Sequence, residues 1–321
     1  MQLTFLGTGG GAPTRSRNVA AIALTLPERG ELYLLDCGEG TQQQCLRAPS
    51  VRLSQLSRVF ITHLHGDHVF GLVGLLASRA LAQGGTSPVA LYGPAALEPY
   101  VRGILQSTGT YFGYPVTYHT VRPGVVFEDA QIVVECASVR HRCDAYAYAV
   151  QEKPQAGRFD VDAAKALNIP SGPVYGRLKR GETVTLGDGR VIDGRSLVGA
   201  DRPGRRIVYS GDTAYCAEMV TLARDADLLV HESTFAESER DLAGRAHHST
   251  ASDAANVAKE AGVRQLVLTH VSPRYDADGG VGLDTLLSEA RTVFADTEVA
   301  YDFLRIEVPR REAGEHSPDD E

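Results

Sequence analysis

Cysteine, tryptophan and long apolar runs are scarce or missing in this chain, and each absence excludes a class of protein. There is no tryptophan, and the five cysteines are scattered without a C-x-x-C pair. This odd number excludes a complete disulfide framework and predicts reduced, mostly buried thiols. The longest apolar stretch, residues 69–78, is too short to span a bilayer, and the N-terminus lacks the pattern of a signal peptide. We therefore expect a cytoplasmic protein that does not enter membranes.

Basic residues are fewer than acidic ones, which gives a formal net charge of −8 and at first argues against a nucleic-acid partner. Part of the excess lies in residues 310–321, an acidic tail that we expect to be disordered. With 321 residues, 43% of them apolar, the chain can form one large domain or two smaller ones. A local basic patch, rather than the total charge, should decide the partner.

The spacing of apolar residues predicts short strands and helices that alternate along much of the chain. Strands are predicted at residues 3–6, 20–26, 32–35, 59–61, 89–92, 116–120, 132–137, 146–150, 207–209, 228–230 and 265–269. Helices are predicted at residues 69–83, 214–224, 252–261 and 283–294. Several strands end in polar residues, which is typical of a layered α/β protein with its site at the strand ends.

Residues 153–202 depart from this alternation, with few strand patterns and many glycine, proline and charged residues. The prolines and glycines between residues 169 and 181 make a packed core element unexpected. We interpret the segment as an insertion, either a solvated loop or a contact arm, and its length and basic residues favour the arm.

Four side chains that bind metals lie within six residues, directly after the predicted strand 59–61: His63, His65, Asp67 and His68. Alternate residues of an extended segment point the same way, so His63 and His65 can bind one ion together. Asp67 and His68 face another direction and can serve a second ion. The alternative is a histidine-rich polar turn without function, but the spacing favours a two-metal hydrolytic centre.

Three further residues follow predicted strands and are candidate ligands: His141, Asp212 and His270. Each alone is a weak candidate, but together they bring the ligand number to seven, and Asp212 can bridge two ions with its two oxygens. Zinc suits so many imidazoles, and manganese is possible because it tolerates carboxylates. Cys143 is a weaker candidate, since nitrogen and oxygen ligands already suffice. Two divalent ions would also add about four positive charges at the site.

His248 precedes Thr250 and Asp253, whose spacing predicts a capping box at the start of the helix 252–261. We expect His248 just outside the N-terminus of that helix, where the helix dipole and nearby cations oppose its protonation. A general acid at this place needs a carboxylate that holds its proton, and Glu232 is the candidate partner.

These residues resemble the signature of the metallo-β-lactamase superfamily and, within it, the short form of the ribonuclease Z family of tRNA 3′-processing endonucleases. The resemblance runs from residue 1 to about residue 308. Residues 13–18 are similar to a P-x-K-x-R-N loop with Arg15 in place of lysine, and residues 248–250 match an H-S-T motif. Residues 172–179 look like the family's tRNA-binding arm. The three additional features are more specific than the metal signature, which many hydrolases share.

The resemblance implies a fold and a metal centre. The fold is a four-layer αββα sandwich over residues 1–309 with a protruding tRNA-binding arm at about residues 153–202. The centre holds two zinc ions per subunit, one bound by His63, His65, His141 and Asp212, the other by Asp67, His68, Asp212 and His270. The resemblance further implies that Asp67 orients and deprotonates the attacking water and that His248 protonates the leaving oxygen.

The resemblance also implies a substrate and an assembly. Precursor tRNA would be cut after the discriminator nucleotide, leaving a 3′-hydroxyl on the tRNA and a 5′-phosphate on the trailer. The exchange at Arg15 bears on how precursors that encode the CCA end are treated. A homodimer is implied, and the predicted helix 69–83 can form the dimer face or be buried within the domain. The candidate RNA contacts are Arg15, Arg17, Asn18, Gly172, Pro173, Arg177, Lys179, Arg180 and Arg274, the last of which can equally face solvent.

Two other functions fit part of the pattern. A small-molecule phosphodiesterase, or another hydrolase on the same scaffold, would explain the metal ligands but leave the arm and residues 13–18 without a purpose. A non-catalytic RNA-binding module would use metal only for folding, and such sites are normally closed and rich in thiolates. Asp67 and His248 are not required for folding, so they favour the endoribonuclease.

Overall fold

The computed structural model describes residues 1–81, 85–275 and 281–311. Contacts divide the chain into two compact units. The first, which we call the body, contains residues 1–150 and 206–308; the second contains residues 151–205, which we call the inserted unit, and the chain from Pro309 onward. The inserted unit overlaps the predicted arm, residues 153–202. Most of the acidic tail predicted at residues 310–321 lies outside the described residues.

The body contains two seven-stranded sheets. The first has the order β16 (Arg305–Glu307), β1 (Gln2–Gly7), β2 (Ala21–Leu26), β3 (Glu31–Leu35), β4 (Leu56–Phe60), β5 (Val89–Gly93) and β6 (Val116–Thr120). The second has the order β15 (Thr297–Val299), β14 (Leu266–Thr269), β13 (Leu228–Glu232), β12 (Arg206–Tyr209), β9 (Tyr146–Glu152), β8 (Ile132–Ser138) and β7 (Gly124–Glu128). The strands predicted from alternation all lie in these sheets.

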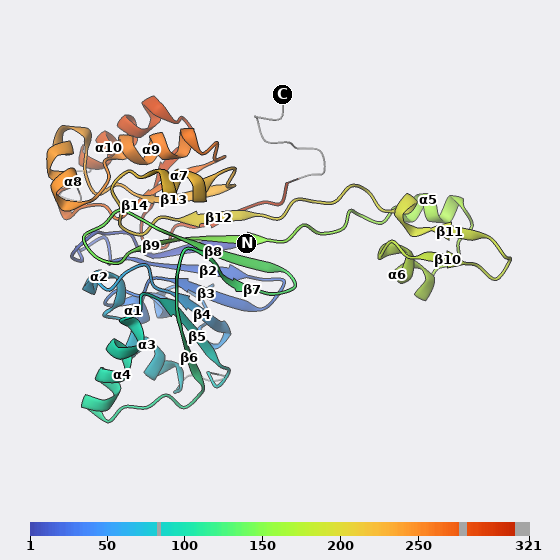
Figure 1. Ribbon diagram of the computed structural model, residues 1–321, viewed down its shortest axis with the longest axis horizontal. Helices are drawn as coiled ribbons and strands as arrows, with labels where there is room; N and C mark the ends of the chain where they lie inside the picture. Colours follow the sequence, from blue (N-terminus) through green and yellow to red (C-terminus); the bar gives the residue numbers. More distant parts are fainter. Residues whose placement is uncertain (82–84, 276–280, 312–321) are drawn as a thin grey trace. The chain divides into compact units, whose positions relative to one another are not determined.

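Three clusters of buried apolar side chains hold the layers together. One lies between the sheets and contains residues of both, among them Phe5, Phe60 and Val230. Another packs α1 (Thr41–Arg47), α3 (Leu72–Arg79) and α4 (Leu97–Thr108) on the first sheet. The remaining one packs α7 (Ala217–Ala223), α9 (Ala251–Glu260) and α10 (Val281–Val293) on the second sheet. Figure 1 shows these helices on the outer faces of the two sheets, so the predicted four-layer αββα sandwich is confirmed.

Parallel pairing brings the polar strand ends together. In the second sheet β12, β13 and β14 are parallel neighbours, and in the first sheet β3, β4 and β5 are parallel neighbours. The carboxyl ends of parallel strands lie at the same edge of a sheet, which is where ligands bind in layered α/β proteins. The residues that follow these strands therefore meet at one edge of the body.

The predicted helices are only partly correct. The helix expected at residues 69–83 is interrupted: α2 (Gly66–Val69) ends at residue 69 and α3 begins at Leu72, while residues 82 and 83 of the prediction lie outside the described residues. The interruption includes Gly71, which packs closely against another segment: a Cβ atom there would lie 2.0 Å from the carbonyl oxygen of Gly38. The capping box of Thr250 and Asp253 at the start of α9 is confirmed, whereas α4 was not predicted. No helix of the described residues has both the length and the apolar character needed to cross a membrane.

The inserted unit has a core of its own, which corrects the expectation that it lacks packed elements. It contains α5 (Val161–Ala166), α6 (Pro173–Lys179) and a hairpin of β10 (Thr183–Thr185) and β11 (Val191–Asp193). Gly172 is the N-cap of α6 with φ 134° and Pro173 is its first residue. Proline fits the first helical position because the amide hydrogen it lacks would have no partner there. The buried apolar side chains of this core are Ala164, Ile169, Leu178, Val184, Leu186 and Leu197.

We predict that Leu178→Ala opens the inserted unit and leaves the body folded. Leu178 is fully buried in a core of only six buried apolar side chains, and such a truncation costs about 2–5 kcal/mol. Hydrogen exchange followed by mass spectrometry should show loss of protection in peptides from residues 160–198 alone. The exposed Val191 of the same unit provides a control, Val191→Ala, that should exchange like the wild type. Unchanged protection in Leu178→Ala would contradict an independent core.

Candidate metal centre

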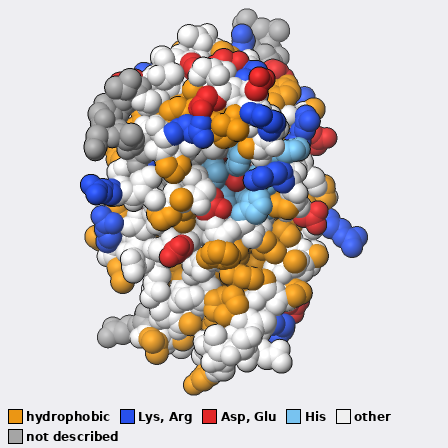
Figure 2. All heavy atoms as spheres, turned by 90° about the vertical axis from the view of Figure 1, so that its left-hand side faces the viewer, with side chains coloured by type: hydrophobic (Ala, Val, Ile, Leu, Met, Phe, Trp, Pro, Cys, Tyr) orange, Lys and Arg blue, Asp and Glu red, His pale blue; other side chains and the backbone are white. Residues whose placement is uncertain are grey.

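The seven predicted ligands come from the ends of strands and from the loops that follow them. His63 and His65 follow β4, and Asp67 and His68 lie in the short helix α2. Asp212 follows β12, His270 follows β14 directly, and His141 lies between β8 and β9. Figure 2 shows histidine side chains gathered in a hollow on one face of the molecule, with apolar and basic side chains around them.

The structure brings His63, His65, His141 and Asp212 together, with one ligand atom of each within 4.8 Å of the others. His65 Nδ1 lies 2.9 Å from His63 Nε2 and 3.2 Å from His141 Nε2. Asp212 Oδ2 lies 3.6 Å from His63 Nε2. This first group has the nitrogen and oxygen donors that suit a divalent cation.

A second group consists of Asp67, His68, Asp212 and His270, again with one ligand atom of each within 4.8 Å of the others. Asp212 Oδ1 lies 3.2 Å from both His68 Nε2 and His270 Nε2, and His270 Nε2 lies 3.3 Å from Asp67 Oδ2. One oxygen of Asp212 thus faces each group. Gly10 permits this packing, because a Cβ atom there would lie 2.7 Å from the ring of His270.

The hydrogen bonds of these residues test whether they fit a metal. Among the described residues, Asp212 Oδ1 is buried and has no hydrogen-bond partner, which is costly for a carboxylate unless a cation completes it. The outer ring nitrogens of four histidines do have partners: His63 Nδ1 with Thr62 Oγ1 at 3.0 Å, His68 Nδ1 with Asp36 Oδ2 at 2.7 Å, His141 Nδ1 with the His247 carbonyl at 3.0 Å and His270 Nδ1 with Thr234 Oγ1 at 2.9 Å. Such partners leave the Nε2 lone pairs free for a metal. The residues fit a divalent metal site.

The protonation states of His63 and Asp212 agree with metal binding. Burial, together with the neighbouring His68, lowers the pKa of His63 to about 2, so its imidazole is neutral as a ligand must be. Burial alone would raise the pKa of Asp212, but His270 and His68 hold it well below its usual value. The carboxylate is therefore ionised in spite of being enclosed.

His248 and Glu232, the pair expected for proton transfer, lie in contact. Glu232 Oε1 is 2.7 Å from His248 Nδ1. Burial opposes the charge of His248, but the adjacent carboxylate outweighs it and raises the pKa of the imidazole to about 9. The expectation that this position opposes protonation is corrected by Glu232, which is itself fixed by the amides of Thr213 and Ser249 at 2.8 and 3.1 Å.

Comparisons with known proteins identify the family. A model described as a beta-lactamase superfamily domain matches residues 190–271, and one described as anti-Pycsar protein Apyc1 matches residues 1–151. Ribonuclease Z of Synechococcus sp. (strain CC9605) is 56% identical over 316 residues, which cover 97% of this chain and 99% of the relative. The chain belongs to the ribonuclease Z family.

Further relatives agree with this membership. Ribonuclease Z of Nostoc sp. (strain PCC 7120 / SAG 25.82 / UTEX 2576) is 54% identical over 311 residues, 97% of this chain and 96% of the relative. Among solved structures, the human tRNase Z, short form, is 27% identical, with a TM-score of 0.70, and the match covers 96% of this chain and 100% of that one. The match of almost the entire length extends through the inserted unit.

The loop of residues 13–18, which the ribonuclease Z resemblance assigned to RNA, has a mixed placement. Arg15 is exposed, but Arg17 is only 4% exposed, and its Nη1 donates to Thr8 Oγ1 and to the Ala300 carbonyl at 2.7 and 2.6 Å. The buried guanidinium cannot reach RNA, so the role expected for Arg17 is corrected to holding the loop. Asn18 Nδ2 likewise donates to the backbone of Glu39 at 2.8 Å.

The other predicted RNA contacts are exposed but partly paired. In the inserted unit Arg177 and Arg180 each lie 2.9 Å from a carboxylate oxygen of Glu182, which reduces the positive charge available there. Lys179 is exposed on α6. In the body Arg274 forms an ion pair with Glu239, and its guanidinium lies over the ring of Phe235.

The five cysteines are all free, as expected, and four of them are buried. Cys143 is the exposed one, and its Sγ lies 4.0 Å from His65 Nε2. His65 turns Nδ1, the opposite nitrogen, toward the other imidazoles. The thiol is therefore outside the groups of metal-binding atoms described above.

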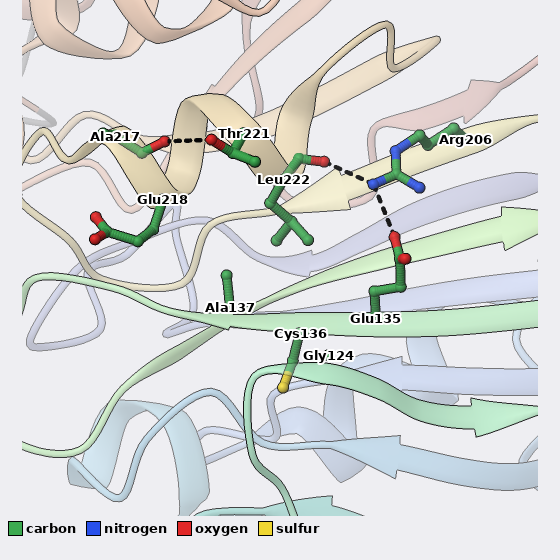
Figure 3. A pocket seen from close by; sticks show the side chains of 9 residues that line it. All are labelled: Gly124, Glu135, Cys136, Ala137, Arg206, Ala217, Glu218, Thr221 and Leu222. Carbon is green, nitrogen blue, oxygen red and sulfur yellow. Dashed lines mark hydrogen bonds and ion pairs between the residues drawn. The ribbon is translucent and has the colours of Figure 1, made fainter.

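A separate pocket of about 540 Å³ opens between β8 and α7. Figure 3 shows Arg206 joined to Glu135 and to the Leu222 carbonyl at its border. Apolar atoms of Cys136, Ala137 and Leu222 line it. None of the seven predicted ligands lies there, so it is not part of the candidate metal centre.

Asp36 is a residue of the centre that the sequence reasoning missed. It is fully buried in the left-handed region with φ 57°, and it accepts hydrogen bonds from the Thr62 amide and hydroxyl and from the Tyr209 hydroxyl. It also contacts His68 directly and, through Thr62, His63. One carboxylate therefore orients a ligand in each metal group. The only sequence signal was its place at the end of a predicted strand.

We predict that Asp36→Asn weakens metal binding about 10- to 100-fold, the usual cost of losing a partner of a metal ligand. An amide nitrogen at the Oδ2 position would oppose the donors of Thr62, His68 and Tyr209. Chelator competition against zinc measures the loss, and Tyr209→Phe, which removes one donor only, is the milder control. Wild-type affinity in Asp36→Asn would show that Asp36 does not position the ligands.

Proposed function

We propose that this protein is a zinc-dependent endoribonuclease that removes the 3′ trailer from precursor tRNA. The cut falls after the discriminator nucleotide and leaves a 3′-hydroxyl on the tRNA and a 5′-phosphate on the trailer. The observation that carries the proposal is the pair of metal-binding groups that share Asp212, in a chain 56% identical to a ribonuclease Z over nearly its whole length.

Two zinc ions fit the two groups, one at His63, His65, His141 and Asp212 and one at Asp67, His68, Asp212 and His270. Five imidazoles among seven ligands favour zinc over the carboxylate-tolerant manganese. When bound, such a pair of ions lowers the pKa of water and neutralises charge that develops on phosphoryl oxygens.

Asp67 is the residue that orients the attacking water and accepts its proton. Burial would raise the pKa of Asp67, but His270 and His68 lower it below its usual value, so the carboxylate is ionised. Its Oδ2 also accepts a hydrogen bond of 2.7 Å from the Gly11 amide. That amide and the imidazoles fix the direction of the carboxylate, as a general base requires.

His248 is the general acid. As the water oxygen bonds to phosphorus, the bond from phosphorus to the 3′ oxygen breaks, and His248 donates a proton to that oxygen. A pKa of about 9 keeps the imidazole charged at neutral pH. Glu232 holds the charge and the orientation through Nδ1, which leaves Nε2 as the donating nitrogen.

RNA binding is assigned to exposed residues of two regions. In the inserted unit, the proposed tRNA-binding arm, Lys179 with Arg177 and Arg180 contacts phosphates, while Gly172 and Pro173 begin the helix that carries them. Contacts of this kind give affinity without reading sequence. In the body, Arg15 and Asn18 mark the loop that would meet the 3′ end, and Arg274 can exchange Glu239 for a phosphate.

A homodimer, in which the arm of one subunit holds tRNA for the other, completes the proposal. The apolar side of α3, with Leu72, Leu75 and Leu76, is buried within the body, so it is not the dimer face. Exposed apolar side chains of the body, among them Leu46, Phe70, Leu81 and Tyr111, are available to a partner subunit.

We predict that the zinc-loaded protein cuts a precursor tRNA once, after the discriminator nucleotide, and that Asp67→Ala lowers the rate by at least about 100-fold. Sequencing of both products and detection of the 5′-phosphate on the trailer locate the cut. A matched precursor that encodes CCA measures how the Arg15 loop treats that end. Hydrolysis of bis(p-nitrophenyl) phosphate without cleavage of either precursor would support the small-molecule phosphodiesterase instead.

Deletion of residues 170–181 should greatly weaken cleavage of precursor tRNA and largely spare hydrolysis of bis(p-nitrophenyl) phosphate, because it removes α6 with the basic residues of the arm and leaves the metal ligands. The deletion also removes Leu178 from the core of the inserted unit, so Lys179→Glu serves as a variant that keeps the fold. It should raise KM for precursor and reduce the salt dependence of binding. Equal losses on the two substrates would contradict the arm assignment.

A further inference from the structure

Thr234 lies where the proton-donating pair and a metal ligand come closest. It follows β13 by two residues and is 7% exposed. β13 and β14 are parallel with Glu232 opposite Thr269, and the Ser233 amide donates to the Thr269 carbonyl at 2.9 Å. The segments that follow β13 and β14 therefore leave the sheet side by side, which brings the Thr234 side chain against His270.

Three functional side chains surround the Thr234 hydroxyl. Its Oγ1 lies 2.6 Å from Glu232 Oε2, 2.9 Å from His270 Nδ1 and 3.3 Å from His248 Nδ1. The hydroxyl has a single proton, and Glu232, an ionised carboxylate, can only accept. The hydroxyl must then donate to Glu232, and its oxygen accepts the Nδ1 hydrogen of His270.

In the neutral ring that metal binding requires, this order of donors fixes the tautomer of His270. With the hydrogen on Nδ1, the lone pair lies on Nε2, the nitrogen that faces Asp67 Oδ2 at 3.3 Å and Asp212 Oδ1 at 3.2 Å. Without an acceptor beside Nδ1, the buried ring would leave a donor unsatisfied or move its hydrogen to Nε2, where it blocks a metal.

We propose that Thr234 is a positioning residue that joins the general-acid pair to the metal ligand His270. Its hydroxyl holds Glu232 in place for His248 and, through the same oxygen, keeps His270 in the form that binds metal. The inference rests on the proposed function for the role of His248, whereas the effect on His270 concerns metal binding alone.

A replacement for Thr234 should fill the volume of its hydroxyl, because the side chains around that hydroxyl could otherwise bind a cation themselves. Glu232, His248 and His270 each offer a ligand atom within 4.8 Å of the others, and Thr234 Oγ1 lies among them. Valine is therefore the informative replacement, because it removes the hydroxyl yet fills its volume. Serine is the matched control, since it keeps the hydroxyl and loses only a methyl group.

The experiment compares zinc affinity, by chelator competition in the absence of RNA, in Thr234→Val, Thr234→Ser and the wild type. We expect about a 10- to 100-fold loss of affinity at one of the two zinc sites in Thr234→Val and wild-type affinity in Thr234→Ser. On precursor tRNA at saturating zinc, kcat should fall in Thr234→Val while KM stays unchanged, because no RNA contact is lost.

Wild-type zinc affinity in Thr234→Val, or an equal loss in Thr234→Val and Thr234→Ser, would overturn the proposal. If Thr234→Val lowers the melting temperature of the metal-free protein, Thr234→Ala removes the same hydroxyl with less demand on space. Loss in Thr234→Ala beside a wild-type Thr234→Ser again supports the role. Because zinc affinity is measured without RNA, the result for Thr234 can be interpreted even if the protein proves not to be a ribonuclease.

Discussion

The arrangement of the candidate metal centre depends on the buried carboxylate of Asp212, which both groups of ligands share. It is 3% exposed and presents one oxygen to each group of imidazoles. An ionised carboxylate without compensation costs several kcal/mol in such surroundings. Imidazoles that bind a metal must be neutral, so in the metal-bound state they orient toward this carboxylate but cannot cancel its charge. The body therefore favours a positive charge at this point, and the second sheet places the carboxylate there because Asp212 lies three residues after the end of β12.

Around that carboxylate, four of the five histidine ligands have the outer ring nitrogen held by a partner within the protein. A threonine hydroxyl, a buried aspartate and a backbone carbonyl each accept or share a hydrogen with a ring nitrogen. His270 itself has φ 57°, a conformation that costs a residue other than glycine of order 1 kcal/mol and is retained where function requires it. The directions of these four ligands are thus set by the protein before a cation arrives.

Much of this centre was predictable because its residues follow strands in the sequence. A two-residue period places His63 and His65 together, and a polar residue after an apolar run marks Asp212 and His270. The partners of these ligands were not predictable in the same way. Asp36 meets Thr62 and His68 at separations of 26 and 32 residues, and only the pairing of β3 with β4 in the first sheet brings such positions together.

Two expectations were wrong for related reasons: the RNA contact assigned to Arg17, and the lack of packed elements in the inserted unit. A sequence shows that Arg17 is charged but not that its guanidinium is buried against Thr8 and the Ala300 carbonyl. Glycine and proline read as signs of irregular chain, yet Gly172 and Pro173 occupy the cap and first turn of α6, where both residues suit a helix. Composition alone does not distinguish a helix start from a loop.

The Glu182 carboxylate, shared by Arg177 and Arg180, has a consequence for turnover. Any phosphate that approaches these guanidinium groups must compete with an anion already tethered beside them. The competition lowers affinity for every polyanion alike and returns the arginines to a neutralised state as soon as a product departs. In the proposed tRNA-binding role of the inserted unit, the same competition would favour release of each mature tRNA.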